Sequence, residues 1–376
     1  MQILHETDPS SVYTARVQSG LYDSVVDQIL ALPQGTALAM STYEEDFRRV
    51  TNNWSGNFSY QSANTTVEHE SILVGQLCHS SMGTKFNARG NHYAGTGFNP
   101  IFIEDKSRVK FVFTLSVPTN ATHRMQTLWD NQVATLNEVI DADREELKRR
   151  SKNLPFKEWT DHSTSDKNLP PDLINVLSGQ IYVVRDADPT AKRTKITKKS
   201  IAKSSETKES IASRPSKTEE LDFDSNMQDD DGNMAESSPH IPEVPANVPT
   251  ASTNDLYNPS ILPDYGGELF RHEKAMLRQL DMRDTDNNLV PPKDWYNTFT
   301  PGCLIMARVT LHAFSWESRR VYQLNAHSIR LLDKSIEPVE ERLGGVVPNT
   351  SDATSSSNTA ASAAMSAFSL GKRAHD

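Results

Sequence analysis

Aromatic and cationic side chains alternate along residues 295–335, near the C-terminal end of the sequence. Exposed rings can stack on flat groups, and the planar guanidinium group of arginine forms forked hydrogen bonds to phosphate or carboxylate oxygens. The segment therefore has the chemistry to hold a ligand that combines rings with negative charge. Its candidate contact residues are Trp295, Tyr296, Phe299, Arg308, His312, Phe314, Trp316, Arg319, Arg320, Tyr322 and Arg330.

The same residues also have a purely structural interpretation. A ring in a strand is more often buried in a core than exposed. The arginines have acidic neighbours in the sequence at Asp294, Glu317 and Asp333. Arg319 and Arg320 nevertheless fall at an expected turn, where a charged side chain must face solvent or a partner. Burial in the folded protein distinguishes the two interpretations.

A second group of candidates lies in the glycine-rich loop KFNARGNHYAGTGFN, residues 85–99. Its glycines allow a ligand to approach the backbone closely, and its cations suit a phosphate group. The loop lacks the GK[ST] ending of a nucleotide-binding P-loop, so we expect no nucleotide hydrolysis. A plain surface loop is the alternative. The candidate contact residues are Lys85, Arg89, His92 and Tyr93.

Complete catalytic and metal-binding sets are missing from the sequence. The eleven histidines form no HxH, HExxH or HxxxH pattern, and no GxSxG motif occurs. Asp284 and Asp286 lack the remaining ligands of a calcium loop. Asp141 and Asp143 lie two residues apart on an expected helix, and hence on different faces. We therefore expect no enzymatic activity, no cofactor and no metal, with a metal-dependent nuclease as an alternative.

The elements expected to position these residues are mainly strands. Residues 109–117 alternate between apolar and polar side chains, which predicts a strand with one buried face. Residues 302–316 and 320–333 predict a long β-hairpin with a bulge at 326–328. Helical spacing of apolar residues predicts helices over 21–32, 125–150 and 266–282. Shorter extended segments are expected over 36–40, 71–78 and 180–186.

The fold class expected from this pattern is α+β. Residues 186–255 lack apolar periodicity and are rich in Lys, Ser, Thr, Glu, Asp and Pro, which predicts a disordered linker. The tail 346–376 has a similar composition. Because a hairpin is not stable alone, residues 256–345 should complete a sheet begun within residues 1–185. We therefore expect a mainly antiparallel β-barrel or sheet with flanking helices, interrupted by a long disordered insertion.

The second half of the expected linker, residues 218–255, alone carries a charge of −10, which equals the net charge of the whole chain. Residues 218–255 contain ten acidic and no basic side chains, which makes this run a candidate surface for protein partners. Only two cysteines and no bilayer-length apolar run are present, which favours a reducing compartment and no membrane partner. The first half of the linker, residues 186–217, is basic and contains a candidate nuclear-import signal, Lys192, Arg193, Lys195, Lys198 and Lys199. We therefore expect a nuclear protein, with the cytoplasm as the alternative.

The hairpin, in which Pro301-Gly302 opens a long strand and the return strand is rich in rings and arginine, resembles the strand pattern of oligonucleotide-binding (OB) barrels. The resemblance covers about residues 295–335. It implies binding of single-stranded DNA or RNA, with bases stacked on rings and phosphates held by cations. We predict a non-enzymatic single-stranded nucleic-acid-binding protein, DNA-directed, in replication, recombination or a mobile element's life cycle. A protein-interaction scaffold with a regulatory linker is the alternative.

Overall fold

The computed structural model describes residues 12–51, 57–96, 98–149, 154–164, 171–184, 252–253, 255–316 and 318–340. The expected disordered segments 186–255 and 346–376 lie outside the described residues, apart from 252–253 and 255. The candidate nuclear-import residues Lys192, Arg193, Lys195, Lys198 and Lys199 also lie outside them. Within the described part, no helix is long and apolar enough to cross a membrane.

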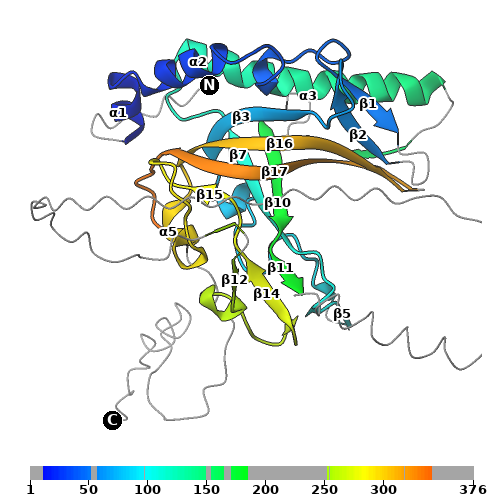
Figure 1. The fold of residues 1–376 in the computed structure, drawn as a ribbon, viewed down its shortest axis with the longest axis vertical. Coiled ribbons are helices and arrows are strands. Elements are labelled where there is room, and N and C mark those ends of the chain that lie inside the picture. The colour runs from blue at the N-terminus through cyan, green and yellow to red at the C-terminus, as the bar shows by residue number, and fades with distance from the viewer. Residues whose placement is uncertain are drawn as a thin grey trace, which may run out of the picture.

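Five strands pair in a closed ring inside a ten-stranded sheet (Figure 1). They are β3 (Glu70–Leu77), β7 (Lys110–Ser116), β10 (Leu173–Gln180), β16 (Leu304–Ser315) and β17 (Arg320–Asp333). β3 pairs with β7, β7 with β10, β10 with β17 and β17 with β16, which pairs again with β3. Of these five pairings in the ring, only that of β10 with β17 is parallel. Strands from both sides of residues 185–251 therefore pair in one sheet.

The ring encloses the main hydrophobic core, as strand periodicity requires. On β7, Phe111, Phe113 and Leu115 are fully buried. Lys110 and Val112 alternate with them and face outward, because successive side chains of a strand point to opposite faces. The predicted strand at 109–117 and the predicted hairpin are confirmed. The predicted bulge is also confirmed, because the β16–β17 register shifts between Arg308 and Val309, opposite 326–328.

Shorter strands extend this sheet and form three small ones. In the large sheet, β2 (Phe58–Ser62) pairs with β16, and β1 (Phe47–Thr51) pairs with β2. β8 (Phe156–Lys157) and β15 (Met282–Arg283) pair with β17, and β9 (Thr160–Asp161) pairs with β10. The small sheets contain β11 (Tyr182–Val184), β14 (Ala275–Arg278) and β12 (Leu256–Tyr257); β6 (Ile103–Glu104) and β13 (Phe270–Arg271); and β4 (Gly95–Thr96) and β5 (Asn99–Pro100).

Helices cover one side of the sheet (Figure 1). They are α1 (Val12–Gln18), α2 (Leu21–Leu30) and α3 (His123–Arg149), and a short helix, α5 (Trp295–Thr298), precedes β16. Val25, Val26 and Ile29 of α2 pack in one apolar cluster with Val74 of β3 and Leu304 of β16. The predicted helices at 21–32 and 125–150 are confirmed. The expected fold class is confirmed in its coarser form, a mixed structure of mostly strands with helices.

Two pairings of the ring are short, β3 with β7 and β10 with β17, each with only two residue pairs in register. Helix α3 compensates between β3 and β7. The buried side chain of Gln132 donates to the Val74 carbonyl at 2.9 Å and accepts from the Val74 amide at 2.8 Å. This approach depends on Gly75, because a Cβ at that position would lie 2.8 Å from the Trp129 ring. The helix thus satisfies backbone groups that a neighbouring strand would otherwise pair.

Two predicted elements are wrong. The helix expected at 266–282 is instead a chain of short strands, β13, β14 and β15. Gly266 and Gly267 have positive φ angles of 124° and 78°, so the chain turns where the helix was expected to begin. Leu277 is buried by pairing of β14 with β11 and β12, not by a helical face. The extended segment expected at 36–40 forms a 3-10 turn at Leu38–Met40.

A buried ionic cluster joins α3 to β17. Asp143 of α3 accepts hydrogen bonds from the Tyr322 hydroxyl at 2.5 Å and from Arg320 Nη1 at 3.2 Å. Arg49 of β1 binds its other carboxylate oxygen. Arg320 and Tyr322 are therefore not the exposed contact residues that the sequence suggested. Asp141 lies on the solvent side of α3, so the expectation that the two aspartates lie on different faces is confirmed.

We predict that Asp143→Ala destabilises the fold by about 3–5 kcal/mol, because it leaves a buried arginine without its counter-ion. Asp141→Ala is the matched control, because this aspartate is exposed and pairs with Arg144 on the same helix. It should change the free energy of unfolding by less than about 1 kcal/mol. Urea unfolding curves measure both. Equal stability of the two variants would refute the structural role of Asp143.

Candidate nucleic-acid interface

The outward-facing side chains of β7, β10, β17 and β16 form one continuous surface, here called the polar face. Leu177 of β10 lies beside Val112 of β7 on one side and Asn325 of β17 on the other. Asn325 in turn lies beside Thr310 of β16. Strand periodicity places the following residues on this face: Lys110, Val112, Thr114, Asn175, Leu177, Arg308, Thr310, His312, Phe314, Gln323, Asn325 and His327. Of these, Thr114 and Thr310 are buried by neighbouring groups.

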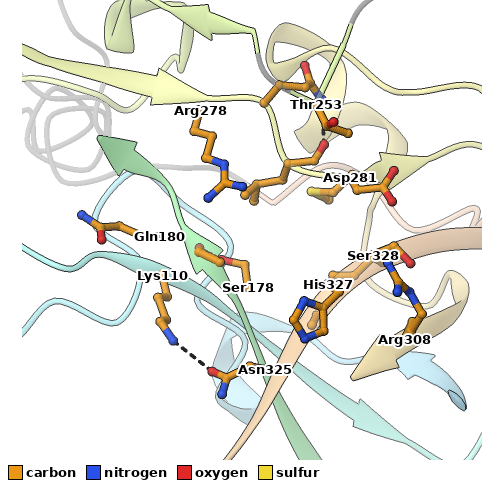
Figure 2. A pocket seen from close by; sticks show the side chains of 16 residues that line it. Lys110, Ser178, Gln180, Thr253, Arg278, Asp281, Arg308, Asn325, His327 and Ser328 are labelled. Carbon is orange, nitrogen blue, oxygen red and sulfur yellow. Dashed lines mark hydrogen bonds between the residues drawn. The ribbon is translucent and has the colours of Figure 1, made fainter. Parts of the chain in front are cut away.

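A cavity of about 490 Å³ opens where the polar face meets β14 and β15 (Figure 2). Its cationic and polar lining includes Lys110, Ser178, Gln180, Arg278, Arg308, Asn325 and His327. Asp281 also lines the cavity, but its carboxylate binds Arg283 Nε at 2.7 Å. The cavity wall is therefore net positive.

Lys110 and Arg278 supply the uncompensated charge of this cavity. Among the described residues, neither forms an ion pair with a carboxylate. Lys110 Nζ donates to the Asn325 side-chain oxygen at 2.9 Å, as Figure 2 shows. Burial, and secondly the charge of Arg108, lower the pKa of the Lys110 ammonium group. An anionic ligand would oppose this shift, because its negative charge favours the charged form of the lysine.

Two further side chains of the polar face, one arginine and one histidine, lie against carboxylates. Arg308 Nη1 lies 2.7 Å from a carboxylate oxygen of Glu70, and His312 Nε2 lies 3.0 Å from Glu68. Burial lowers the pKa of His312, and the charges of Lys110 and His327 lower it further, whereas Glu68 raises it. A polyanion that binds here must therefore compete with the two glutamates.

Three rings follow one another along the outer edge of the hairpin: His312, Phe314 and Trp316, here called the aromatic row. The His312 and Phe314 ring centroids are 6.1 Å apart with 12° between their planes, and those of Phe314 and Trp316 are 6.2 Å apart. The Trp316 ring is half exposed, and the Arg319 guanidinium lies 5.6 Å from its centroid. His312 and Phe314 are partly buried, so Trp316 is the exposed ring of the row. A ring beside a cation suits a chain of bases joined by phosphates.

The second group of candidate contact residues lies in the loop between β3 and β7, residues 78–109. Lys85, Arg89 and Tyr93 are exposed, and Lys85 pairs with Val112 through the backbone, next to the polar face. His92 instead holds the loop together, because its Nε2 lies 2.8 Å from the Ile101 carbonyl oxygen. The Phe98 ring is fully exposed.

Three of the predicted contact residues are core residues. Trp295, Tyr296 and Phe299 are buried, so the expectation that their rings form an exposed platform is wrong. Trp295 donates to the Val290 carbonyl at 2.9 Å, and the Tyr296 hydroxyl donates to Asp264 at 3.0 Å. Both aromatic residues lie in or beside α5 and close one end of the ring. Their polar atoms are satisfied internally and leave nothing for a ligand.

Arg330 lies beyond the bulge of β17, opposite Met306 of β16 and beside Arg283 of β15, outside the stretch named above. Its Nη2 donates to the Thr285 carbonyl at 3.1 Å, in the turn after β15. Of the predicted residues in the hairpin, the structure therefore gathers Arg308, His312, Phe314, Trp316 and Arg319 around one surface. Whether they contact nucleic acid stays a prediction.

Sequence reasoning missed several residues of this surface. Lys110 was visible as a polar position of a strand with one buried face, but nothing in the sequence paired it with Asn325, 215 residues away. Arg278 was hidden by the incorrect helix at 266–282. His327 was visible only as part of the expected bulge. Phe98 lies in the glycine-rich loop, where its isolated apolar side chain was the available signal.

Comparisons with known proteins identify no family. No protein-family model matches the chain, and no curated protein matches it. Among solved structures, the chain is similar to gp2.5, a single-stranded DNA-binding protein encoded by bacteriophage T7. The match has 11% identity and a TM-score of 0.29, and it covers 76% of this chain and 100% of that one. A likeness at this level carries no argument about fold or function.

We predict that Glu68→Gln lowers the pKa of His312 further, because it removes the negative charge that favours the imidazolium form. A proton NMR titration of the imidazole resonances measures the change. His272 is the internal control, because burial also lowers its pKa but its acidic neighbour is Asp105. An unchanged or raised pKa of His312 would contradict the Glu68 contact.

Proposed function

We propose that this chain is an OB-barrel protein that binds single-stranded nucleic acid, DNA in preference to RNA, on the polar face and without catalysis. The observation that carries the proposal is that the aromatic row and the cationic cavity share one face of a closed five-stranded ring. A nuclear role in replication, recombination or a mobile element's life cycle belongs to the same proposal.

The strand order supports the barrel assignment. β16 lies beside β3, followed by β7 and β10, so the fourth ring strand in the chain lies beside the first, as in a Greek key. β17 then closes the ring between β10 and β16. OB barrels are five-stranded Greek-key barrels that bind oligonucleotides on their second and third strands and on two loops. The corresponding elements here are β7, β10, the 78–109 loop and the 316–319 turn.

Aromatic and cationic side chains would contact different parts of the bound strand. Phe314 and Trp316 offer ring faces, on which bases stack whatever their sequence. Arg319 lies beside the Trp316 ring and suits a phosphate. Arg308, further along β16, and Lys85 and Arg89 on the long loop suit phosphates as well. Binding by these groups requires unpaired bases, because the rings must reach base faces that a duplex stacks internally.

We predict that Trp316→Ala weakens binding of single-stranded DNA by about 1–3 kcal/mol, the usual range for one stacked base. The melting temperature should stay close to that of the unmodified protein, because the ring is half exposed. Leu30→Ala, which removes a half-exposed apolar side chain from α2, is the control. Fluorescence anisotropy with a labelled oligonucleotide measures the affinity. Unchanged affinity in a folded Trp316→Ala variant would remove the aromatic row from the interface.

We predict that Arg308→Ala flattens the dependence of log affinity on log salt concentration by about 0.7, the value for one phosphate contact on a single strand. Arg124→Ala is a closely matched control. Arg124 has 47% of its side chain exposed against 45% for Arg308, and it also pairs with a carboxylate, that of Asp27, but on the helical side of the sheet. Equal slopes for the two variants would contradict a phosphate contact at Arg308.

The same titrations test the alternatives. A protein-interaction scaffold predicts a weak salt slope and no difference between the Arg308 and Arg124 variants. A metal-dependent nuclease predicts cleavage of the oligonucleotide when Mg²⁺ is added. Tight, salt-dependent binding of intact single strands, weaker for duplex DNA, would support the proposed function over both.

A further inference from the structure

Lys110 fixes the orientation of the Asn325 amide in the cavity. A lysine ammonium group has donors and no acceptor, so the Asn325 atom 2.9 Å from Nζ must be the oxygen. The amide nitrogen of Asn325 then remains to donate to a ligand, beside the other protons of Lys110 (Figure 2). The pair offers donors to the cavity, which suits a carbonyl oxygen.

Arg278 supplies a second type of contact in the same cavity. It is exposed on β14 and, within the described residues, has no carboxylate partner, in contrast to Arg308 with Glu70. A guanidinium group in this situation suits a phosphate, which it can bind through two parallel hydrogen bonds. The cavity therefore combines a site for a carbonyl oxygen with a site for an anion.

The size of the cavity limits what can occupy it. About 490 Å³ lies within the range of roughly 300–1,000 Å³ found for pockets that hold one small ligand. A single nucleotide has both required groups, a phosphate and, in every DNA base except adenine, a carbonyl oxygen. Adenine presents an amino group where guanine presents its O6 carbonyl.

We propose that the cavity holds one unstacked nucleotide of the bound strand, with a base carbonyl on Lys110 and Asn325 and a phosphate on Arg278, and that it disfavours adenine. The proposal rests on the proposed function and adds a base preference to it. The aromatic row binds any base by stacking, whereas the cavity reads one base by its hydrogen-bonding groups.

The test compares the affinities for oligo(dT) and oligo(dA) of equal length at one salt concentration. Asn325→Leu should reduce the dT-to-dA affinity ratio by roughly 5- to 150-fold, the range for one well-placed base contact. Gln323→Leu is the matched control for the ratio alone, because Gln323 is an amide on the same strand and face that does not line the cavity. It should leave the dT-to-dA ratio unchanged even where it weakens binding of both oligonucleotides. Using the change in ratio removes the contribution of base stacking within the free oligonucleotides.

Two further variants test the separate contacts. Lys110→Met should lower the dT-to-dA ratio as Asn325→Leu does, and so provides an independent measurement if one variant is unstable. Arg278→Gln should weaken binding of both oligonucleotides and flatten the salt slope by about 0.7. A wild-type preference for oligo(dA), or a ratio that persists in both folded variants of the Lys110–Asn325 pair, would overturn the subsite.

The outcomes separate this inference from the proposed function. Suppose that Trp316→Ala weakens binding while the cavity variants leave the dT-to-dA affinity ratio unchanged. Binding at the aromatic row is then supported, and the nucleotide subsite in the cavity is refuted. If oligo(dT) does not bind at all, both fail. A free nucleotide also has a base carbonyl and a phosphate, and could occupy the cavity instead of a nucleotide of a bound strand. Calorimetry should find dTMP much weaker than oligo(dT), because dTMP lacks contacts to the aromatic row. Equal or tighter binding of dTMP would overturn the assignment to a strand.

Discussion

The pairing of β16 along both of its edges is the constraint on which the rest of the structure depends. One edge binds β3, from the N-terminal part of the chain, and the other binds β17. β17 in turn binds β10, so residues before 185 and after 251 cannot fold independently into this ring. The polar face exists only because of this closure. Two of its residues in direct contact, Lys110 and Asn325, come from different strands and lie 215 residues apart in the sequence.

Closure of the ring also decides which polar groups are available for binding. Where β3 and β7 separate, Gln132 of α3 satisfies the Val74 backbone, so this gap is filled by the protein itself. Asp143 similarly neutralises Arg320 in the interior. By contrast, Lys110 and Arg278 face a cavity and have no carboxylate partner among the described residues. Burial costs free energy for a cation without a partner, and the cavity is therefore where a ligand gains most from supplying charge.

Local sequence pattern predicted the parts of the fold that depend on one element. The alternation at 109–117 and the long hairpin follow from side-chain periodicity, which the ring preserves. The helix expected at 266–282 failed because Leu277 and Leu280 have helical spacing, while pairing with β11, β12 and β17 holds this region extended. The burial of Trp295 and Arg320 was also unpredictable, since it depends on α5 closing the core and on Asp143 of a distant helix. Side-chain periodicity in the sequence shows which residues share one face of an element. Which other elements cover that face depends on tertiary contacts.

Glu68 and Glu70 each contact a side chain of the hairpin on the polar face. Glu70 pairs with Arg308, and Glu68 lies beside His312, in contacts that are partly exposed. Such pairs contribute little to stability, typically about 0–1 kcal/mol, so a phosphate can displace the carboxylate at small cost. Lys110 and Arg278 need no such exchange. Under the proposed function, a bound strand would contact Lys110 and Arg278 without displacing a carboxylate, whereas at Arg308 it would have to displace Glu70.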